Sequence, residues 1–520
     1  MQTEVLIVGA GPTGLVLALW LTRLGVRVRI IDRDAGPGET SRAFAVQART
    51  LELYDQIGLA RVAVRRGRIL TALNVHERKK PIARIPFGDF GRDLSPFPYI
   101  LVLLQDRHEK LLIEPLAEAG VEVERNTELV GFEDDGARVR AWLKRSDGED
   151  EFCEAAFLCG CDGVHSTIRA LIGTGYRGAT YGRTFYVADA VATGPMVDGE
   201  VHYAMVGPDL CRVFPLIGKD RVRLIGRVPD SAKISGFPVT YDDVADQVNQ
   251  ATGLKVSMVE WFSTYRVHHR VAANFRKGRA FLLGDACHTH SPAGSQGLNT
   301  GVGDAVNLAW KLSAVLRDEA DPILLDTYEA ERIEVARTIV ETTDLAFGLQ
   351  VNPTGAMQFL RRGLARLMPA LMHLEPVRLL FFRTVSQLML GYHKRRLSVG
   401  RAGRISGGDR LPWIGLTGGA DNYAPLRKVS WQVHVYGQAD RRLREACARR
   451  SLPLHEFRFG ANARQRGLAK DASYLVRPDG YVAYASRGQN PRGLERLLSV
   501  FRLKPVGGPA VNAPEALSAK

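Results

Sequence analysis

The stretch that decides the fold is Gly284-Asp285-Ala286-Cys287-His288-Thr289-His290-Ser291-Pro292-Ala293-Gly294-Ser295-Gln296-Gly297-Leu298-Asn299. Its last three residues open a predicted amphipathic helix, whose apolar side is formed by Val302, Ala305, Val306, Ala309, Leu312 and Val315. Because a helix begins with free N–H groups and a partial positive charge, such a turn favours a negatively charged ligand. We interpret the stretch as a second nucleotide-facing turn, since the chain has a first one near its start.

The first turn is Gly9-Ala10-Gly11-Pro12-Thr13-Gly14, directly after the apolar run Val5–Val8. A GxGxxG turn between a buried strand and a helix is typical of dinucleotide-binding folds, because glycines allow a tight turn and the close approach of a pyrophosphate. Pro12 suits the first turn of the helix that follows. These residues predict a Rossmann-like βαβ unit with a phosphate at the helix N-terminus.

An acidic residue follows the second predicted strand, Val26–Ile31. Asp32 lies at the spacing expected for a carboxylate that binds an adenosine ribose hydroxyl. Arg33 comes next and would tolerate a ribose phosphate, so Asp32 alone leaves the nucleotide undecided.

A third motif, Asp162-Gly163-Val164-His165-Ser166-Thr167-Ile168-Arg169, follows the apolar residues Ala155–Leu158. GxGxxG at Gly9, DGxxSxxR at Asp162 and GDxxHxxxPxxxQGxN at Gly284 resemble, in order and spacing, the three fingerprints of the class A FAD-dependent aromatic monooxygenases. The resemblance covers about residues 3–345. It implies a bound FAD and, because the chain has a single dinucleotide fingerprint, an NAD(P)H that binds transiently in a groove.

The resemblance also implies roles for the residues of the second turn. Asp285 matches an acid that contacts the ribityl chain of FAD, and Pro292 matches a proline beside the isoalloxazine. The N–H groups of Gly297, Leu298 and Asn299 would face the pyrimidine oxygen of the flavin, where a positive helix end stabilises the anionic reduced form.

Further FAD contacts are implied outside the two turns. Arg42 and Gln105 match positions at the pyrophosphate and the ribityl chain, and either Leu129 or Val130 lines the adenine. Arg169 matches a residue that in relatives takes part in the groove approached by the nicotinamide, and an ordinary exposed salt-bridge arginine is the alternative. The complete set of expected FAD contacts is Gly9, Gly11, Pro12, Thr13, Gly14, Asp32, Arg33, Arg42, Gln105, Val130, Asp162, Asp285, Pro292, Gly297, Leu298 and Asn299.

Three residues are assigned to the substrate. Ser295 stands where many relatives have a glycine, so it either biases substrate choice or faces solvent, and both interpretations stay open. Arg212 and Phe214 lie on an alternating strand of the sheet expected over the flavin. A catalytic base would have to reach a phenol hydroxyl, and the spacing favours none of the available positions, which are Tyr186, His202, Tyr203, Arg212 and Tyr265.

The predicted fold class is α/β, with a Rossmann-like FAD-binding domain, an antiparallel β-sheet substrate domain and a C-terminal thioredoxin-like domain. The last part resembles phenol hydroxylase-type members around Asp409–Pro412 and Val476–Ala483. Its only cysteine, Cys447, falls inside a helix, so we expect no redox role. The expected boundaries are 1–75, 100–180 and 265–350 for the FAD domain, 76–99 and 181–264 for the sheet, 351–403 for a helical connector and 404–510 for the last domain.

The resemblance implies that NAD(P)H reduces the FAD, that O2 forms a C4a-hydroperoxyflavin, and that a phenolic or polycyclic aromatic substrate is hydroxylated. Alternatives are a Baeyer–Villiger-type or polyketide-tailoring oxygenation, or a flavin-dependent reductase that does not oxygenate. The identity of the substrate and the choice between NADH and NADPH stay open.

Composition limits the remaining classes of protein. The net charge of +14 comes mostly from late arginines, which alternate with leucines at helical spacing and indicate solvated helix faces, not a nucleic-acid site.

Six scattered cysteines make no disulfide framework, and Cys287, His288 and His290 lack the spacing of a metal site, so we expect no metal. No signal peptide or membrane span is predicted, hence a cytoplasmic location is expected, with a homodimer as one option.

Overall fold

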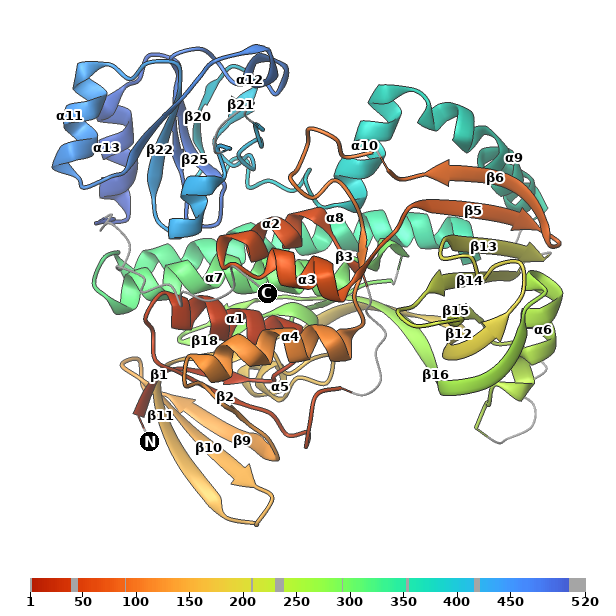
Figure 1. Cartoon of the computed structure of the whole chain (residues 1–520). Coiled ribbons are helices and arrows are strands. Elements are labelled where there is room, and N and C mark those ends of the chain that lie inside the picture. Colours follow the sequence, from red (N-terminus) through yellow and green to blue (C-terminus); the bar gives the residue numbers. More distant parts are fainter. Residues whose placement is uncertain are drawn as a thin grey trace.

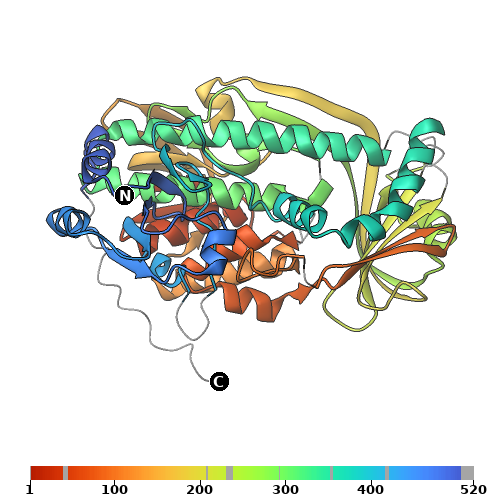
Figure 2. The ribbon, with the colours of Figure 1, turned by 90° about the horizontal axis from the view of Figure 1, so that it is seen from above.

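The computed structural model describes residues 2–38, 45–88, 90–206, 209–229, 238–291, 293–351, 355–415 and 421–504. A central body carries a large sheet at one end and a separate C-terminal unit near the other end (Figures 1 and 2). Among the described residues, no helix combines the length and the apolar character needed to cross a membrane.

The central body is built on a sheet in the order β17-β18-β11-β1-β2-β8, in which β18, β11, β1, β2 and β8 run parallel. The end of β1, Val5–Val8, is buried, as expected for a parallel strand covered on both faces. The antiparallel strands β9 and β10 extend the sheet beside β11. The strands are β1 (Gln2–Val8), β2 (Val28–Ile31), β8 (Val123–Glu124), β9 (Thr127–Asp134), β10 (Val139–Arg145), β11 (Asp150–Gly160), β17 (Arg276–Lys277) and β18 (Ala280–Leu282).

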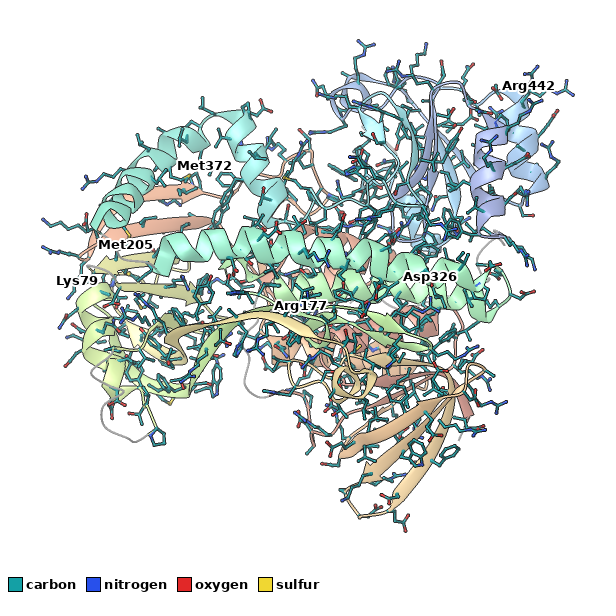
Figure 3. All side chains as sticks on the ribbon, turned by 180° about the vertical axis from the view of Figure 1, so that it is seen from behind. Lys79, Arg177, Met205, Asp326, Met372 and Arg442 are labelled. Carbon is teal, nitrogen blue, oxygen red and sulfur yellow. The ribbon has the colours of Figure 1, made fainter. Side chains whose placement is uncertain are left out.

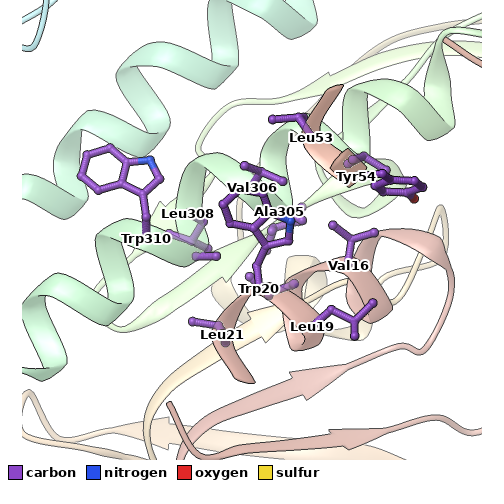
Figure 4. Packing of buried hydrophobic residues seen from close by; sticks show 14 of the residues in the cluster. Val16, Leu19, Trp20, Leu21, Leu53, Tyr54, Ala305, Val306, Leu308 and Trp310 are labelled. Carbon is purple, nitrogen blue, oxygen red and sulfur yellow. The ribbon is translucent and has the colours of Figure 1, made fainter. Parts of the chain in front are cut away.

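Two helices from distant parts of the sequence pack together on this sheet. Helix α1 (Pro12–Arg23) lies along α7 (Gly297–Leu316), and the fully buried Trp20 faces Ala305 and Val306 (Figure 4). This contact places the start of α1 beside the start of α7. The two predicted nucleotide-facing turns are therefore brought to the same edge of the sheet.

The other helices of the body surround this pair. A short sheet, β3-β7-β4, lies beside α2 and α3. The elements are α2 (Ala48–Gln56), α3 (Ala60–Arg66), α4 (Gln105–Glu118), α5 (Thr167–Ile172), α8 (Asp326–Val351), β3 (Ala45–Val46), β4 (Arg68–Ile69) and β7 (Leu101–Val102), with 3-10 turns η2 (Gly284–Ala286), η3 (Ala293–Ser295) and η4 (Pro322–Leu325).

The large sheet has the order β19-β16-β12-β15-β14-β13-β5-β6. It was expected to be antiparallel, and it is, except that β5 and β13 run parallel. Domain boundaries were predicted near positions 180 and 265. The long strands β12 and β16 continue across these two positions without interruption. The strands are β5 (Ala72–Glu77), β6 (Lys80–Pro86), β12 (Tyr176–Thr193), β13 (Val201–Val206), β14 (Asp209–Pro215), β15 (Arg221–Arg227), β16 (Lys255–Ala272) and β19 (His288–Thr289).

The two faces of this sheet have different neighbours. One face packs on α6 (Asp242–Thr252) in a separate apolar cluster that includes Tyr186 and Val244. The other face contributes Val187, Phe214 and Ile225 to the core of the central body. We call the latter the inner face. Helix α9 (Gly355–Met372) contacts β6, and α10 (Glu375–Val385) returns the chain to the body.

The C-terminal unit contains a sheet in the order β21-β20-β25-β24-β22-β23. Strands β22 and β23 are parallel and are joined by α11, while β24 and β25 are antiparallel, as expected for a thioredoxin-like domain. Helix α11, where Arg442 lies, is far from Met205 on β13 and from Lys79 in the turn between β5 and β6 (Figure 3). The elements are β20 (Val399–Ala402), β21 (Ile405–Ser406), η5 (Ala424–Lys428), β22 (Gln432–Tyr436), α11 (Arg441–Arg449), β23 (Leu454–Phe457), α12 (Ala461–Gln465), β24 (Ser473–Val476), β25 (Val482–Ser486) and α13 (Pro491–Val500).

Candidate functional site

The glycines of the first turn have different reasons to lack a side chain. Gly9 has a φ of +101°, and a Cβ there would lie 2.3 Å from the carbonyl oxygen of Cys161. A Cβ on Gly14 would lie 2.0 Å from the carbonyl oxygen of Gly9. A Cβ on Gly11, in contrast, would meet no described atom within 4 Å. The space beside Gly11 is thus open, as a turn that admits a pyrophosphate requires.

Asp32 directly follows β2, next to this turn. Its carboxylate accepts hydrogen bonds from the N–H groups of Ala10 at 2.6 Å and Asp34 at 2.9 Å. The guanidinium of Arg125 lies 3.7 Å away. Asp32 therefore fixes the loop after β1 and remains partly exposed, whereas Arg33 points to solvent.

A buried carboxylate lies near the same edge. Gln105 begins α4, and its Nε2 donates to Oε1 of Glu109 at 2.8 Å. The other oxygen of Glu109 accepts the N–H of Gly38 at 3.0 Å, and burial raises the pKa of Glu109. Gln105 was predicted from the sequence, and Glu109 was not. The helical spacing of four residues, which puts both side chains on one face, was the available signal.

Asp162 begins the motif that leads into α5. Its Oδ2 accepts the N–H of Ile168 at 3.1 Å, which caps the helix, and burial raises the pKa of its carboxyl. The Oδ1 atom is buried and has no hydrogen-bond partner among the described residues. A buried acceptor without a hydrogen bond costs free energy. This atom therefore fits a donor from a bound group, such as a ribityl hydroxyl of FAD.

Arg169 connects the motif that begins at Asp162 with the turn that begins at Gly284. It donates to the carbonyl oxygens of Val164 at 2.7 Å and Ala286 at 2.9 Å. Its guanidinium also stacks 4.0 Å from the ring centre of Tyr176. The Tyr176 hydroxyl donates to the carbonyl oxygen of Asp285 at 3.3 Å, while the Asp285 side chain is exposed. The structure thus brings Arg169 and Asp285 together, and Tyr176 is a neighbour that sequence reasoning missed.

The starts of α1, η2 and α7 meet at Thr13. Gly284 has a φ of +60°, and a Cβ on it would lie 2.7 Å from Oγ1 of Thr13. A Cβ on Gly301 would lie 2.3 Å from the same oxygen. Both glycines are therefore needed for the two turns to approach one another.

Asn299 fixes the beginning of α7. Its Oδ1 accepts from the N–H of Gln47 at 2.8 Å and from Oγ1 of Thr50 at 2.7 Å. Its Nδ2 donates to the carbonyl oxygens of Ala45 at 3.0 Å and Ser295 at 2.9 Å. The side chain of Asn299 is thus occupied by protein, and it is the backbone N–H groups at the start of α7 that can bind a ligand.

A buried ion network lies behind the turn. Asp304 accepts from Nε2 of His288 at 2.8 Å and from Nε of Arg332 at 2.6 Å, as well as from the N–H of Gly284 at 2.9 Å. Cys287, His288 and Asp304 are close enough to share a cation. Because the Asp304 carboxylate is already paired with Arg332, we assign this cluster to support of the turn.

The inner face of the large sheet carries the residues assigned to the substrate. Arg212 pairs across the strands with Tyr203, and its guanidinium lies 5.7 Å from the centre of the Tyr203 ring. Phe214 meets the same ring edge to face at 6.3 Å. Tyr186 belongs to the cluster around α6, on the opposite face. His202 shares that opposite face and bonds with Asp198 at 2.8 Å.

The remaining predicted residues have varied placements. Arg42 and Pro292 lie outside the described residues. Val130 is 48% exposed on β9, whereas its neighbour Leu129 is buried. Ser295, with a φ of +52°, is half-buried in the turn before α7.

Two protein families match the chain. The FAD binding domain family matches residues 2–343, and the family described as aromatic-ring hydroxylase, C-terminal, matches residues 406–501. These matches cover the central body with its large sheet, and the C-terminal unit.

Individual relatives agree with these families. A 6-methylpretetramide 4-monooxygenase of Streptomyces rimosus is 42% identical over 66% of the chain and 62% of its own length. A flavin-dependent monooxygenase of Mycobacteroides abscessus is 30% identical over 92% of the chain and 96% of its own length. The anhydrotetracycline hydroxylase OxyS of Streptomyces rimosus has a solved structure that superposes with a TM-score of 0.76 at 30% identity, covering 97% and 100% of the two chains. The chain therefore belongs to the FAD binding domain family and is a FAD-dependent aromatic monooxygenase.

Proposed function

We propose that this monooxygenase uses NAD(P)H and O2 to hydroxylate a polycyclic aromatic compound. The observation that carries the proposal is the inner face of the sheet, where Tyr203, Arg212 and Phe214 form an aromatic and cationic surface. Relatives named for the oxygenation of 6-methylpretetramide and anhydrotetracycline support a fused-ring substrate. A relative named pentachlorophenol 4-monooxygenase makes single-ring phenols the second candidate class.

The residues of the cofactor site fit FAD. Gly11 leaves room for a pyrophosphate, Asp162 offers a buried oxygen that has no partner among the described residues, and the start of α7 offers N–H groups at a positive helix end. When bound, FAD supplies the redox and oxygen chemistry. The protein then has to hold the flavin, orient the substrate and exclude water.

The side chains of the inner face suit an aromatic substrate with an ionisable hydroxyl. The rings of Tyr203 and Phe214 stack or meet other rings edge to face. Arg212 is 9% exposed in the free protein, and a guanidinium in such a setting attracts a phenolate oxygen strongly. We assign these three residues to substrate orientation.

The reduced nicotinamide is expected to approach near Arg169. That side chain is stacked on Tyr176 and anchored to the turn that contains Asp285, so it presents positive charge beside the flavin site. NADH and NADPH are both candidates, and their kcat/KM values should be compared directly. A homodimer is one possible oligomeric state, which light scattering tests.

The experiment is to measure NAD(P)H oxidation by the FAD-loaded protein with tetracyclic polyketides and with simple phenols. Oxidation should be slow without substrate and accelerate with a fused-ring compound, whose product should gain one oxygen atom from 18O2 by mass spectrometry. NMR of the product separates hydroxylation from Baeyer–Villiger insertion. Anaerobic electron transfer to an acceptor, with no oxygenated product from any compound, would replace this proposal by the reductase alternative.

Matched variants of the sheet sharpen the experiment. Phe214→Ala removes a ring from the inner face and should raise KM for the substrate, whereas FAD binding stays unchanged. Tyr186→Phe alters only a hydroxyl on the opposite face, near Cys211. An equal change in KM from both variants would exclude the inner face as the substrate surface.

A further inference from the structure

A short segment of the connector reaches the flavin turn. Val385 is the last residue of α10, Ser386 and Gln387 follow it, and neither family match covers these three residues. Gln387 is 4% exposed, although it lies between elements. It is therefore part of the interior, where its polar side chain requires partners.

Those partners are residues of the turn before and within α7. Nε2 of Gln387 donates to Oε1 of Gln296 at 2.6 Å and to Oγ1 of Thr300 at 3.0 Å, and lies 3.3 Å from the carbonyl oxygen of Gln296. In return, Nε2 of Gln296 donates to the carbonyl oxygen of Val385 at 2.9 Å. The two glutamines thus bind each other's segments reciprocally.

The same segment also contacts α2. The carbonyl oxygen of Ser386 accepts the N–H of Arg49 at 3.2 Å. Since Gln47, two residues before Arg49, donates to the carbonyl oxygen of Gly294 at 3.0 Å, the turn is held from two sides. The connector therefore completes a frame that fixes the position of the start of α7.

The backbone at Gln387 is in an unfavourable conformation. Its φ is +60°, in the left-handed region that favours glycine. Such residues persist where the surrounding contacts determine the conformation, and they concentrate at functional sites. The backbone conformation alone would favour glycine at this position. The hydrogen bonds of the side-chain amide are therefore the reason for a glutamine here.

We propose that Gln387 is a positioning residue for FAD, which acts through Gln296 and Thr300. By holding these two residues, it directs the N–H groups of Gly297, Leu298 and Asn299 at the flavin. The inference rests on the assignment of these N–H groups to the flavin in the proposed function. It predicts that loss of the Gln387 amide changes flavin binding without direct contact between Gln387 and the cofactor.

The test uses two variants of the full chain. Gln387→Gly keeps the left-handed backbone and removes the amide, whereas Gln387→Met keeps the side-chain volume and removes the donor. Both should raise the dissociation constant for FAD about tenfold, the order expected when one or two supporting hydrogen bonds are lost. Both should also shift the visible absorption of the bound flavin, which a change in stability alone would not do.

Gln489 provides a matched control in the C-terminal unit. It has a φ of +47°, is 6% exposed, and donates to the carbonyl oxygens of Gln438 at 2.8 Å and Asp471 at 2.7 Å. Gln489→Gly should lower the melting temperature while the FAD dissociation constant and spectrum stay as in the unaltered protein. An equal loss of FAD affinity from the Gln489 and Gln387 variants would overturn the inference.

Failure of this inference can be told apart from failure of the proposed function, because FAD affinity is measured without substrate. Unaltered FAD affinity and spectrum in both Gln387 variants, beside normal FAD binding by the parent protein, would reject the positioning role only. A parent protein that binds no FAD would reject the cofactor assignment and the inference together.

Discussion

The guanidinium of Arg477 donates to both carboxylate oxygens of Glu331, at 2.7 and 3.0 Å, and neither side chain reaches solvent. Arg477 follows β24 in the C-terminal unit, and Glu331 lies on α8 of the central body. Glu331 also accepts from Lys311 at 2.8 Å, and Arg477 also binds Asp479. At this point the contact between the two parts of the molecule is therefore ionic and buried.

Removal of one member of this pair should lower the stability of the protein strongly. Arg477→Met leaves a buried carboxylate without its main partner and should lower the free energy of unfolding by about 3–5 kcal/mol. Urea unfolding measures this loss. Arg441→Ala is the control, because Arg441 is 92% exposed in its pair with Glu445, and it should cost less than about 1 kcal/mol. Similar losses from both variants would contradict the central role of the buried pair.

The same pair should make stability depend on acid pH. Burial opposes ionisation of Glu331, but Arg477 and Lys311 hold its pKa down, at about 2. A carboxyl whose pKa is lower in the folded state stabilises the protein above its ordinary pKa and loses this contribution as pH falls toward the folded value. The difference in unfolding free energy between the parent and Glu331→Gln should therefore shrink between about pH 4.5 and pH 2. A difference that stays constant over this range would disprove the assignment.

The sequence predicted those parts of the site that local spacing determines. The GxGxxG turn at Gly9 and the helix start at Gly297 are visible because a strand, a turn and a helix follow one another directly. Gln387 was not predictable, since its partners Gln296 and Thr300 are distant in sequence and a buried amide has no periodicity. The parallel pairing of β5 with β13 was missed for the same reason. Long-range hydrogen bonds and strand pairings depend on the folded arrangement and leave no local pattern.

The cysteine of the C-terminal unit should have no role in turnover. Cys447 lies in the second half of α11, is buried, and has a pKa that burial raises to about 11. A redox thiol needs a lowered pKa and access to its partner. Cys447→Ser should therefore leave kcat within a factor of about two, although a polar atom at a packed position lowers stability slightly. A large loss of kcat with normal folding and FAD content would refute this expectation.

Two glycines of the first turn should respond differently to the same substitution. Gly11 has a φ of −73° and a ψ of −179°, which any residue adopts, and an added Cβ meets no described atom. Gly11→Ala should fold normally but place a methyl group in the space for the pyrophosphate, so that the dissociation constant for FAD rises about ten- to a hundredfold. Fluorescence titration of the apoprotein with FAD measures this change.

Gly14→Ala is the matched comparison, because its added Cβ would lie 2.0 Å from the carbonyl oxygen of Gly9 inside the protein. The turn and α1 would have to move apart, so the variant should lose about 2 kcal/mol or more of stability even without FAD. Thermal unfolding of both apoproteins separates the two effects: a methyl group that meets the cofactor lowers affinity alone, and one that meets the backbone lowers stability first. If Gly11→Ala bound FAD as tightly as the parent, the pyrophosphate could not lie beside this turn.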